Sequence, residues 1–282
     1  MAKKRTKSQE TQIAGFCALL AAALVLLIAA LSLPVDPMPE KPDKIVYASP
    51  EGIPKEPAAN PYGPTDFQYD GDYLRCIAGE SSLGVDVSDH QGEIDWQQVR
   101  AAGVEFAMIR VGFRGYESGR MVADECAAAN LEGALAAGLK VGVYFFSQAV
   151  SVDEALEEAN FVLKAIEGWQ IDMPVVFDWE YVSADSRTGN VDAKTLNDCT
   201  LTFCRAIEAA GFKPMVYFNL SQAEYMLQLN RLTDFGFWLA MYTDRMDYPY
   251  KLDMWQYTCS GTVPGIATPV DLDLYLPYPE QD

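Results

Sequence analysis

The chain has 282 residues, of which 50% are hydrophobic and 22% are charged. This composition is typical of a globular protein and too apolar for a disordered chain. Lysine and arginine total 21 against 40 aspartates and glutamates, which gives a net charge of −19. A protein that binds nucleic acid by neutralising phosphates carries the opposite sign, so the composition excludes a nucleic-acid partner.

The N-terminal segment has the charge pattern of a membrane anchor. Residues 1–12 form a basic tail with four lysines and arginines against one glutamate, and residues 13–33 contain no charged side chain. About 20 apolar residues suffice to cross a bilayer as a helix, and a basic flank stays in the cytoplasm. We therefore predict an N-terminal transmembrane helix at 13–33, with the remaining chain outside the cell. A cleaved signal peptide, which would leave a secreted protein, is the alternative.

Residues 34–82 follow as a predicted extracellular linker. Nine prolines fall between residues 34 and 64, and apolar residues show almost no helix or strand spacing there. A proline-rich backbone prefers the extended polyproline conformation and serves as a semi-stiff spacer. We expect this segment to hold the following domain away from the membrane surface.

From residue 83 onward, helix ends alternate with short buried strands. Small residues followed by glycine precede an apolar run at Ala101–Val104, Ala136–Leu139 and Ala209–Phe212. Glycine ends a helix at little cost because it adopts the left-handed conformation freely. Runs of β-branched and aromatic residues then indicate buried strands. This alternation predicts parallel strands that are joined by right-handed crossovers.

The number and spacing of the strands predict a barrel. The candidate strands are Leu83–Val87, Glu105–Val111, Lys140–Phe146, Met173–Phe177, Pro214–Phe218, Gly236–Met241, Leu252–Gln256 and Val270–Tyr275. The first five are separated by room for a helix, whereas the last three are close together. We predict an α/β fold over residues 83–282, a modified TIM-type barrel of five β/α units followed by three β-strands. The carboxyl ends of the strands should carry the chemistry.

Acidic residues gather at these predicted carboxyl ends. Asp86 lies at the end of the first strand, Asp178 and Glu180 follow the fourth, and Asp271 lies in the eighth. Residues two apart in an extended chain face the same side, so Asp178 and Glu180 should project together. Such acids often cap a helix or pair with arginine. A close carboxyl pair also raises the pKa of one member, which can then protonate the leaving oxygen in glycoside cleavage.

Six segments resemble the muramidases of glycoside hydrolase family 25, the Chalaropsis-type lysozymes. They are Gly84–Gly92 with Ile94–Trp96, Ala137–Phe146, Phe177–Glu180, Trp238–Tyr242, Trp255–Tyr257 and Val270–Asp273. They follow the family's order over about residues 83–276. The resemblance implies a barrel of five β/α units and three further strands. It also implies cleavage of the β-1,4 bond between N-acetylmuramic acid and N-acetylglucosamine, with peptidoglycan as the partner and no cofactor.

The resemblance also assigns roles to the acidic residues. Glu180 matches the catalytic acid, and Asp178 matches the carboxylate that orients or stabilises the substrate's 2-acetamido group. Asp86 and Asp271 match the two further acids that line the catalytic groove. The positions where we expect saccharide contacts are Tyr144, Tyr217, Tyr242 and Gln256.

The chain departs from the family at one position, where Phe145 replaces a histidine that many relatives have. His90 is the only histidine, and we expect it to be a hydrogen-bonding structural or groove residue. A single histidine gives little support to a zinc hydrolase or a Ser-His-Asp triad, so we expect no metal.

Five cysteines follow the membrane segment. Because five is odd, at least one is unpaired, and we expect buried thiols in a monomeric protein.

Several alternatives remain open at the sequence level. The expected mechanism is the substrate-assisted retaining route, and an inverting route through an activated water competes with it. A chitinase-like or glucosaminidase barrel hydrolase would also use paired acids. The chitinase pattern, however, needs acidic residues where this chain has Val176 and Met173. An inactive module that binds the cell wall is the other alternative.

Overall fold

The computed structural model describes residues 55–277. The predicted basic tail, the anchor at 13–33 and most of the proline-rich run before residue 55 lie outside these residues. Within the described part of the chain, no helix has the length and apolar character needed to span a bilayer.

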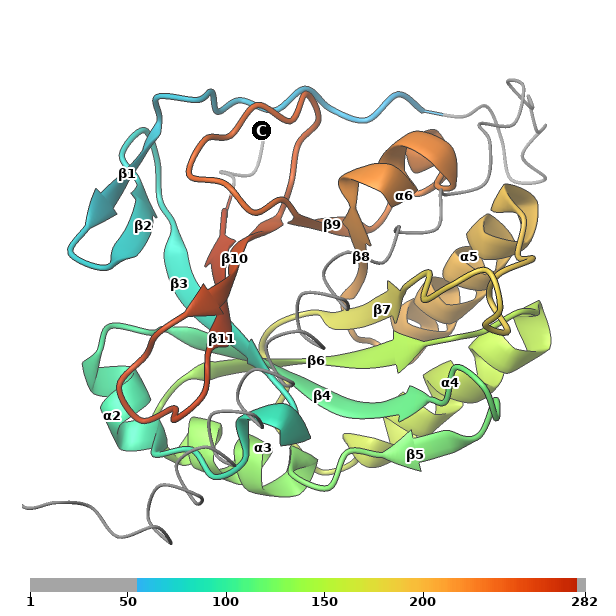
Figure 1. Cartoon of the computed structure of the whole chain (residues 1–282), viewed down its shortest axis with the longest axis horizontal. Coiled ribbons are helices and arrows are strands. Elements are labelled where there is room, and N and C mark those ends of the chain that lie inside the picture. The colour runs from blue at the N-terminus through green and yellow to red at the C-terminus, as the bar shows by residue number, and fades with distance from the viewer. Residues whose placement is uncertain (1–54, 278–282) are drawn as a thin grey trace, which may run out of the picture. The chain divides into compact units, whose positions relative to one another are not determined.

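Eight strands form a closed barrel (Figure 1). They are β3 (Ser82–Val87), β4 (Phe106–Arg114), β6 (Lys140–Ser147), β7 (Val175–Trp179), β8 (Pro214–Asn219), β9 (Gly236–Ala240), β10 (Met254–Gly261) and β11 (Val270–Tyr275). The sheet runs β3-β11-β10-β9-β8-β7-β6-β4, and the pairing of β3 with β4 closes it. All eight predicted strands are present. The short strand β5 (Met121–Ala123), which pairs with the end of β4, is an addition.

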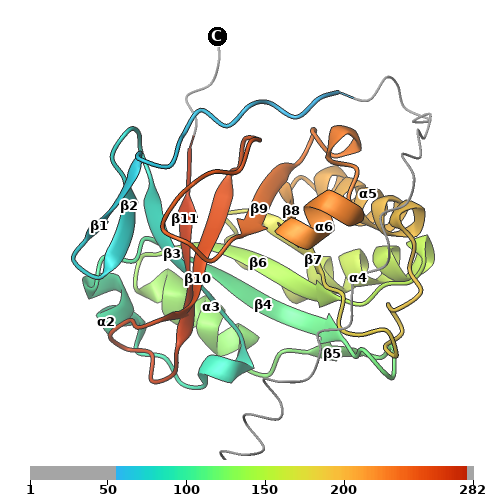
Figure 2. The same cartoon turned by 45° about the horizontal axis from the view of Figure 1, so that its top comes forward.

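A helix follows each of the first five barrel strands. These are α2 (Trp96–Ala101), α3 (Ala127–Ala136), α4 (Val152–Ala165), α5 (Ala193–Ala209) and α6 (Leu220–Tyr225). Two short 3₁₀ turns, η1 (Asp89–Gln91) and η2 (Leu229–Arg231), lie in the connections. Helices α4 and α5 pack together on one side of the barrel, and α2 and α3 lie on another (Figures 1 and 2). The structure is therefore mixed α/β, with an eight-stranded barrel and few helices.

Strand β11 corrects the expectation of a parallel sheet. Seven strands are mutually parallel, but β11 is antiparallel to both β10 and β3. Only residues 262–269 connect β10 to β11. A parallel pair needs a crossover of a dozen or more residues, so the short connection imposes the antiparallel direction. As a result, Asp271 near the start of β11 is paired with Asp86 near the end of β3.

Residues 55–82, which the sequence analysis predicted to belong to a spacer, contain folded structure. Strands β1 (Phe67–Asp70) and β2 (Tyr73–Cys76) form a hairpin that lies beside β3 (Figure 2). The ring of Phe67, which is buried, meets the ring of Trp255 edge to face at a centroid distance of 5.1 Å. Leu74 is fully buried. These apolar side chains cover the outer face of β10, so this part of the predicted linker folds with the barrel.

An apolar cluster fills the barrel interior. Its buried members are Phe106, Met108, Met173, Val176, Met215, Tyr217, Trp238, Ala240 and Met254. The Phe106 ring occupies the space beside Gly84, where any Cβ atom would collide with it. Glycine at this position therefore allows β3 to approach the cluster closely.

The five cysteines in the described residues are free thiols, and Cys199 and Cys204 are buried in α5.

Candidate active site

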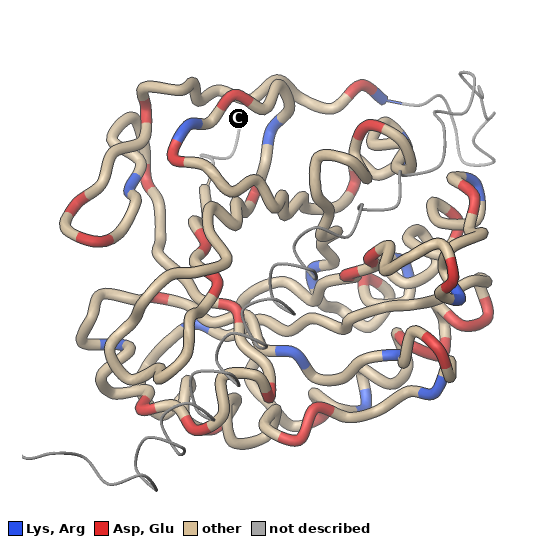
Figure 3. Tube along the Cα trace, viewed as in Figure 1, with Lys and Arg blue, Asp and Glu red and all other residues tan. Residues whose placement is uncertain are grey.

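A cleft of about 270 Å³ lies at the carboxyl ends of the parallel strands. It is lined by Asp86, Ser88, His90, Gln91, Arg110, Tyr144, Phe146, Asp178, Glu180, Tyr217, Trp238, Tyr242, Gln256 and Asp271. All eight residues that the sequence nominated for catalysis or saccharide contact are among them. Acidic positions outnumber basic ones along the trace (Figure 3), and the cleft follows the same pattern with four carboxylates and one arginine.

Strand β7 places Asp178 in the cleft, and the alternation of side chains continues to Glu180, the residue after the strand. Trp179, between them, points away, and its indole Nε1 donates to the carbonyl oxygen of Ala149 at 3.0 Å. The amide of Gln222 donates to the carbonyl oxygen of Trp179. All five residues of β7 are buried, so this strand end is held rigidly.

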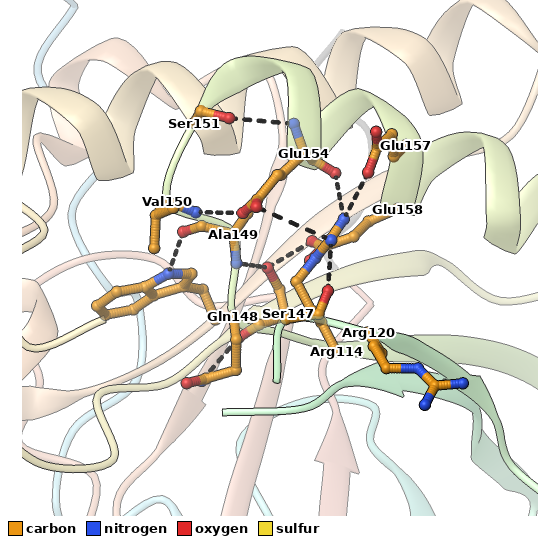
Figure 4. Close-up of polar contacts among 12 residues, drawn as sticks. Arg114, Arg120, Ser147, Gln148, Ala149, Val150, Ser151, Glu154, Glu157 and Glu158 are labelled. Atoms are coloured by element: carbon orange, nitrogen blue, oxygen red, sulfur yellow. Dashed lines mark hydrogen bonds and ion pairs between the residues drawn. The ribbon is translucent and has the colours of Figure 1, made fainter. Parts of the chain in front are cut away.

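The backbone at Glu180 is held by the loop that follows β6. The side-chain amide of Gln148 donates to the carbonyl oxygen of Glu180 at 2.6 Å. Gln148 is itself buried, and its backbone carbonyl oxygen accepts from Arg187 Nη1 at 2.5 Å. Arg187 is ion-paired with Glu154 at 2.7 Å. Glu154 also accepts from the backbone N–H of Val150 at 2.9 Å (Figure 4). Helix α4 thus supports the catalytic candidate through side chains that lie outside the cleft.

A second contact group from α4 supports the end of β6. Glu158, which is fully buried, accepts from Arg114 Nε at 2.6 Å and from Ser147 Oγ at 2.5 Å (Figure 4). Burial raises the pKa of Glu158 to about 7, although the hydrogen bonds from Ser147 and Arg114 act in the opposite direction. Ser147 Oγ also accepts from the backbone N–H of Ala149 at 3.2 Å. The loop that carries Gln148 is therefore anchored at both of its ends.

Gln256 connects the two tyrosines of one cleft wall to Asp86. The hydroxyl groups of Tyr217 and Tyr242 donate to its Oε1 at 2.9 and 3.1 Å. Its Nε2 donates to Asp86 Oδ2 at 2.7 Å. The side-chain oxygen of Gln256 thus accepts from both tyrosines, and its side-chain NH₂ group orients Asp86. Tyr242 is 58% exposed, whereas Tyr217 and Gln256 are buried.

The four carboxyl groups of the cleft all have pKa values above their ordinary range. Burial, followed by the charge of Asp271, raises the pKa of Asp86 and of Glu180. Burial, followed by the charge of Glu180, raises the pKa of Asp178. Burial also raises the pKa of Asp271 to about 6. A carboxyl pKa raised above its ordinary value is what general acid catalysis near neutral pH requires.

Arg110 is the cleft residue that sequence reasoning missed. Its Nε donates to Asp124 Oδ2 at 2.8 Å and its Nη2 to Asp89 Oδ1 at 2.6 Å. The positive charge opposes the effect of burial on the pKa of Asp178. An arginine in the middle of the apolar run 106–113 was the available signal. His90 lies on the rim with its side chain 77% exposed, and its Nδ1 is 3.6 Å from Asp89.

The sequence from residue 85 to 266 matches the family described as Glycosyl hydrolases family 25. The chain belongs to this family. It is therefore a glycoside hydrolase, and the cleft at the strand ends is its candidate active site. The expected resemblance to family 25 is confirmed.

The chain is also similar to individual relatives and to a solved structure. This family 25 chain is 27% identical over 211 residues to the uncharacterized protein YegX of Escherichia coli, with 72% of each chain covered. It is 27% identical to the autolytic lysozyme of Clostridium acetobutylicum over 192 residues, 67% of this chain and 54% of that protein. The modular autolysin LytC of Streptococcus pneumoniae has a similar fold, with a TM-score of 0.61 and 24% identity. That match covers 70% of this chain and 47% of LytC, so this chain spans about half of LytC.

Proposed function

We propose that this protein cleaves the β-1,4 bond between N-acetylmuramic acid and N-acetylglucosamine in peptidoglycan, with Glu180 as the general acid. One observation carries the proposal: Asp178 and Glu180 lie side by side at the end of a buried strand, in a cleft with aromatic walls. Membership of family 25 supports it. So do a relative named an autolytic lysozyme and the structure of LytC with a synthetic peptidoglycan ligand.

In the proposed reaction, protonated Glu180 donates its proton to the bridging oxygen as the bond to the anomeric carbon breaks. The acetamido oxygen of the same sugar attacks that carbon and forms an oxazolinium intermediate, which Asp178 stabilises. Water then attacks the anomeric carbon, the bond from this carbon to the acetamido oxygen breaks and restores the acetamido group, and the water loses a proton to Glu180, which restores the acid. This is the substrate-assisted retaining route.

The surroundings of Asp178 favour this role. Its Oδ1 atom is buried and has no hydrogen-bond partner within residues 55–277. Buried polar oxygens are nearly always paired in native proteins. The N–H of a substrate acetamido group would supply the missing donor at this atom. A hydrogen bond to Asp178 would also aim the acetamido oxygen at the anomeric carbon.

The stereochemistry of the product distinguishes this route from inversion. In the inverting alternative, a carboxylate such as Asp178 activates a water that attacks from the opposite face. NMR of freshly formed product should show the β-anomer first if the acetamido group takes part. Initial appearance of the α-anomer would eliminate the retaining mechanism but leave Glu180 as the acid.

The proposal is tested by turbidity loss of purified cell walls and by mass analysis of the released muropeptides. The wild-type protein should clear the walls and leave reducing ends on muramic acid. Glu180→Gln should lower the rate by about 10²- to 10⁴-fold, the usual contribution of a general acid. Glu132→Gln, at an exposed position of α3, is the matched control and should keep full activity. Reducing ends on glucosamine would indicate a glucosaminidase, and binding without clearance would indicate a wall-binding module.

We further propose that the protein is a monomer anchored in the cell membrane by residues 13–33, with the barrel outside the cell. The basic tail and the uncharged run support this orientation. Residues 34–54 would then span up to about 65 Å if fully extended as polyproline. Protease treatment of intact cells should remove the barrel and leave the tail protected. An N-terminus that begins after residue 33 in the mature protein would replace the anchor with a cleaved signal peptide.

A further inference from the structure

Two buried glutamines hold the backbone at the point where strand β7 ends. The pairing of β7 with β8 ends at Asp178, and its pairing with β6 ends at Trp179. From there on, side chains bond the backbone. Gln222 Nε2 donates to the carbonyl oxygen of Trp179. Gln148 Nε2 donates to the carbonyl oxygen of Glu180 at 2.6 Å. Gln222 is 2% exposed and Gln148 is fully buried, so both contacts are shielded from water.

The side chain of Gln222 is fixed by the start of its own helix. Helix α6 follows β8, the strand that neighbours β7 in the sheet. Gln222 Oε1 accepts from the backbone N–H of Asn219 at 2.8 Å, and the backbone N–H of Gln222 donates to Asn219 Oδ1 at 3.0 Å. This reciprocal pair is the capping box of α6. Because the cap holds the side-chain oxygen, the NH₂ group of Gln222 is directed at the end of β7.

The two contacts fix the backbone on both sides of the Glu180 Cα atom. The carbonyl of Trp179 belongs to the peptide group before this atom, and the carbonyl of Glu180 belongs to the peptide group after it. Peptide groups are planar, so the orientations of these two planes define φ and ψ of Glu180. The direction in which the Glu180 side chain leaves the backbone is therefore set by Gln222 from one side and by Gln148 from the other.

We propose that Gln222 is a positioning residue, whose amide holds the Trp179–Glu180 peptide group so that the Glu180 carboxyl is directed at the scissile bond. This inference rests on the proposed function, since it takes Glu180 as the general acid. Gln222 acts through the backbone and does not line the cleft. A neutral amide suits this place, because a lysine or arginine donor would bring positive charge to Glu180 and favour its ionised form.

The separation of kcat from KM tests the positioning role. Gln222→Met keeps a neutral side chain of similar length but removes the donor to Trp179. A displacement of about 1 Å at a catalytic group can cost about 100-fold in rate. In assays of wall clearance, kcat should therefore fall about 10- to 100-fold, and KM should stay close to that of the wild type. An unchanged kcat would show that the amide positions nothing.

Asn219→Ala is the matched control. It breaks the other half of the same capping box and leaves the amide of Gln222 free to donate to Trp179. Loss of a helix cap lowers stability, so the melting temperature should fall while kcat stays close to that of the wild type. If Asn219→Ala lowers kcat as much as Gln222→Met does, the effect comes from the helix cap and the proposal is wrong.

Gln222→Glu adds a readout that a purely structural role would not change. The introduced carboxyl keeps an acceptor for the N–H of Asn219, but it can donate to the Trp179 carbonyl only when it is protonated. The ratio of its kcat to that of the wild type should therefore approach one at low pH and fall as pH rises through the pKa of this carboxyl. For Gln222→Met, which adds no titrating group, the ratio should be low and constant. If Gln222→Met retains the wild-type kcat and Gln222→Glu alone is impaired, the added charge is responsible and the proposal fails.

NMR measures the hydrogen bond without any use of activity. One NH₂ proton of Gln222 should exchange slowly with water, and the carbonyl ¹³C resonance of Trp179 should move upfield in Gln222→Met. If these signals are present but the wild-type protein does not clear cell walls, the proposed function fails and the contact stands. If the protein clears walls but Gln222→Met leaves the Trp179 resonance in place, the inference fails and the proposed function stands.

Discussion

Phe67 lies in the hairpin ahead of the barrel, and its truncation measures where the folded domain begins. The side chain is 5% exposed, and its ring meets those of Trp255 and Tyr62 edge to face at 5.1 and 5.7 Å. Replacing a buried phenylalanine with alanine lowers the free energy of unfolding by about 3–5 kcal/mol through lost burial and a residual cavity. For a domain of this size, about 2–4 °C of melting temperature corresponds to each kcal/mol. Phe67→Ala should therefore lower the melting temperature by about 6–20 °C.

The control is Tyr69→Ala, on the same strand. Tyr69 is 56% exposed, so its truncation should change the free energy of unfolding by no more than about 0.5 kcal/mol. The assay is thermal unfolding of the full chain, followed by circular dichroism, with one cooperative transition expected for both variants. If residues 55–82 were only a spacer, Phe67→Ala and Tyr69→Ala would have the same melting temperature. Equal melting temperatures would thus refute the conclusion that the hairpin is part of the barrel domain.

Three further predictions concern the catalytic strand and its support. Burial and the charge of Asp271 raise the pKa of Glu180, and the acid must be protonated, so kcat/KM should fall as pH rises through this raised value. Initial rates of wall clearance against pH measure this, and a decline centred at the ordinary glutamate pKa of about 4.3 would contradict it. Gln148→Leu removes the donor to the Glu180 backbone and should lower kcat about tenfold with little change in KM. Gln97→Leu, at an exposed site, should leave both constants unchanged. Glu158 has its pKa raised from 4.5 to about 7, so the folded state binds this proton more tightly than the unfolded state. Its contribution to stability should be complete below pH 4.5 and lost as pH rises through 7. Chemical unfolding across this range should show a smaller loss in Glu158→Gln than in the wild type, because the cleft carboxyls with raised pKa values remain in both.

Local sequence patterns determined the eight barrel strands and the helices between the first five of them. Each apolar run of β-branched and aromatic residues, such as the run that ends at Phe177, has few alternatives to a buried strand. The alternation of β7 also placed Asp178 and Glu180 on one face, because a strand has a side-chain period of two. Together with the family motifs, these patterns were sufficient to locate the cleft.

Only the tertiary structure decided the contacts that orient the site. Gln256 and Asp86 are 170 positions apart, and Gln148 and Glu180 are 32 apart, so no local pattern joins them. The direction of β11 depends on which strands become its neighbours, and the burial of Phe67 depends on the surface that Trp255 presents. Propensity and periodicity act over a few residues, whereas hydrogen-bond partners and burial are set when distant segments pack. The sequence by itself therefore determined which acids and tyrosines reach the cleft, and the fold decided which side chains hold them in place.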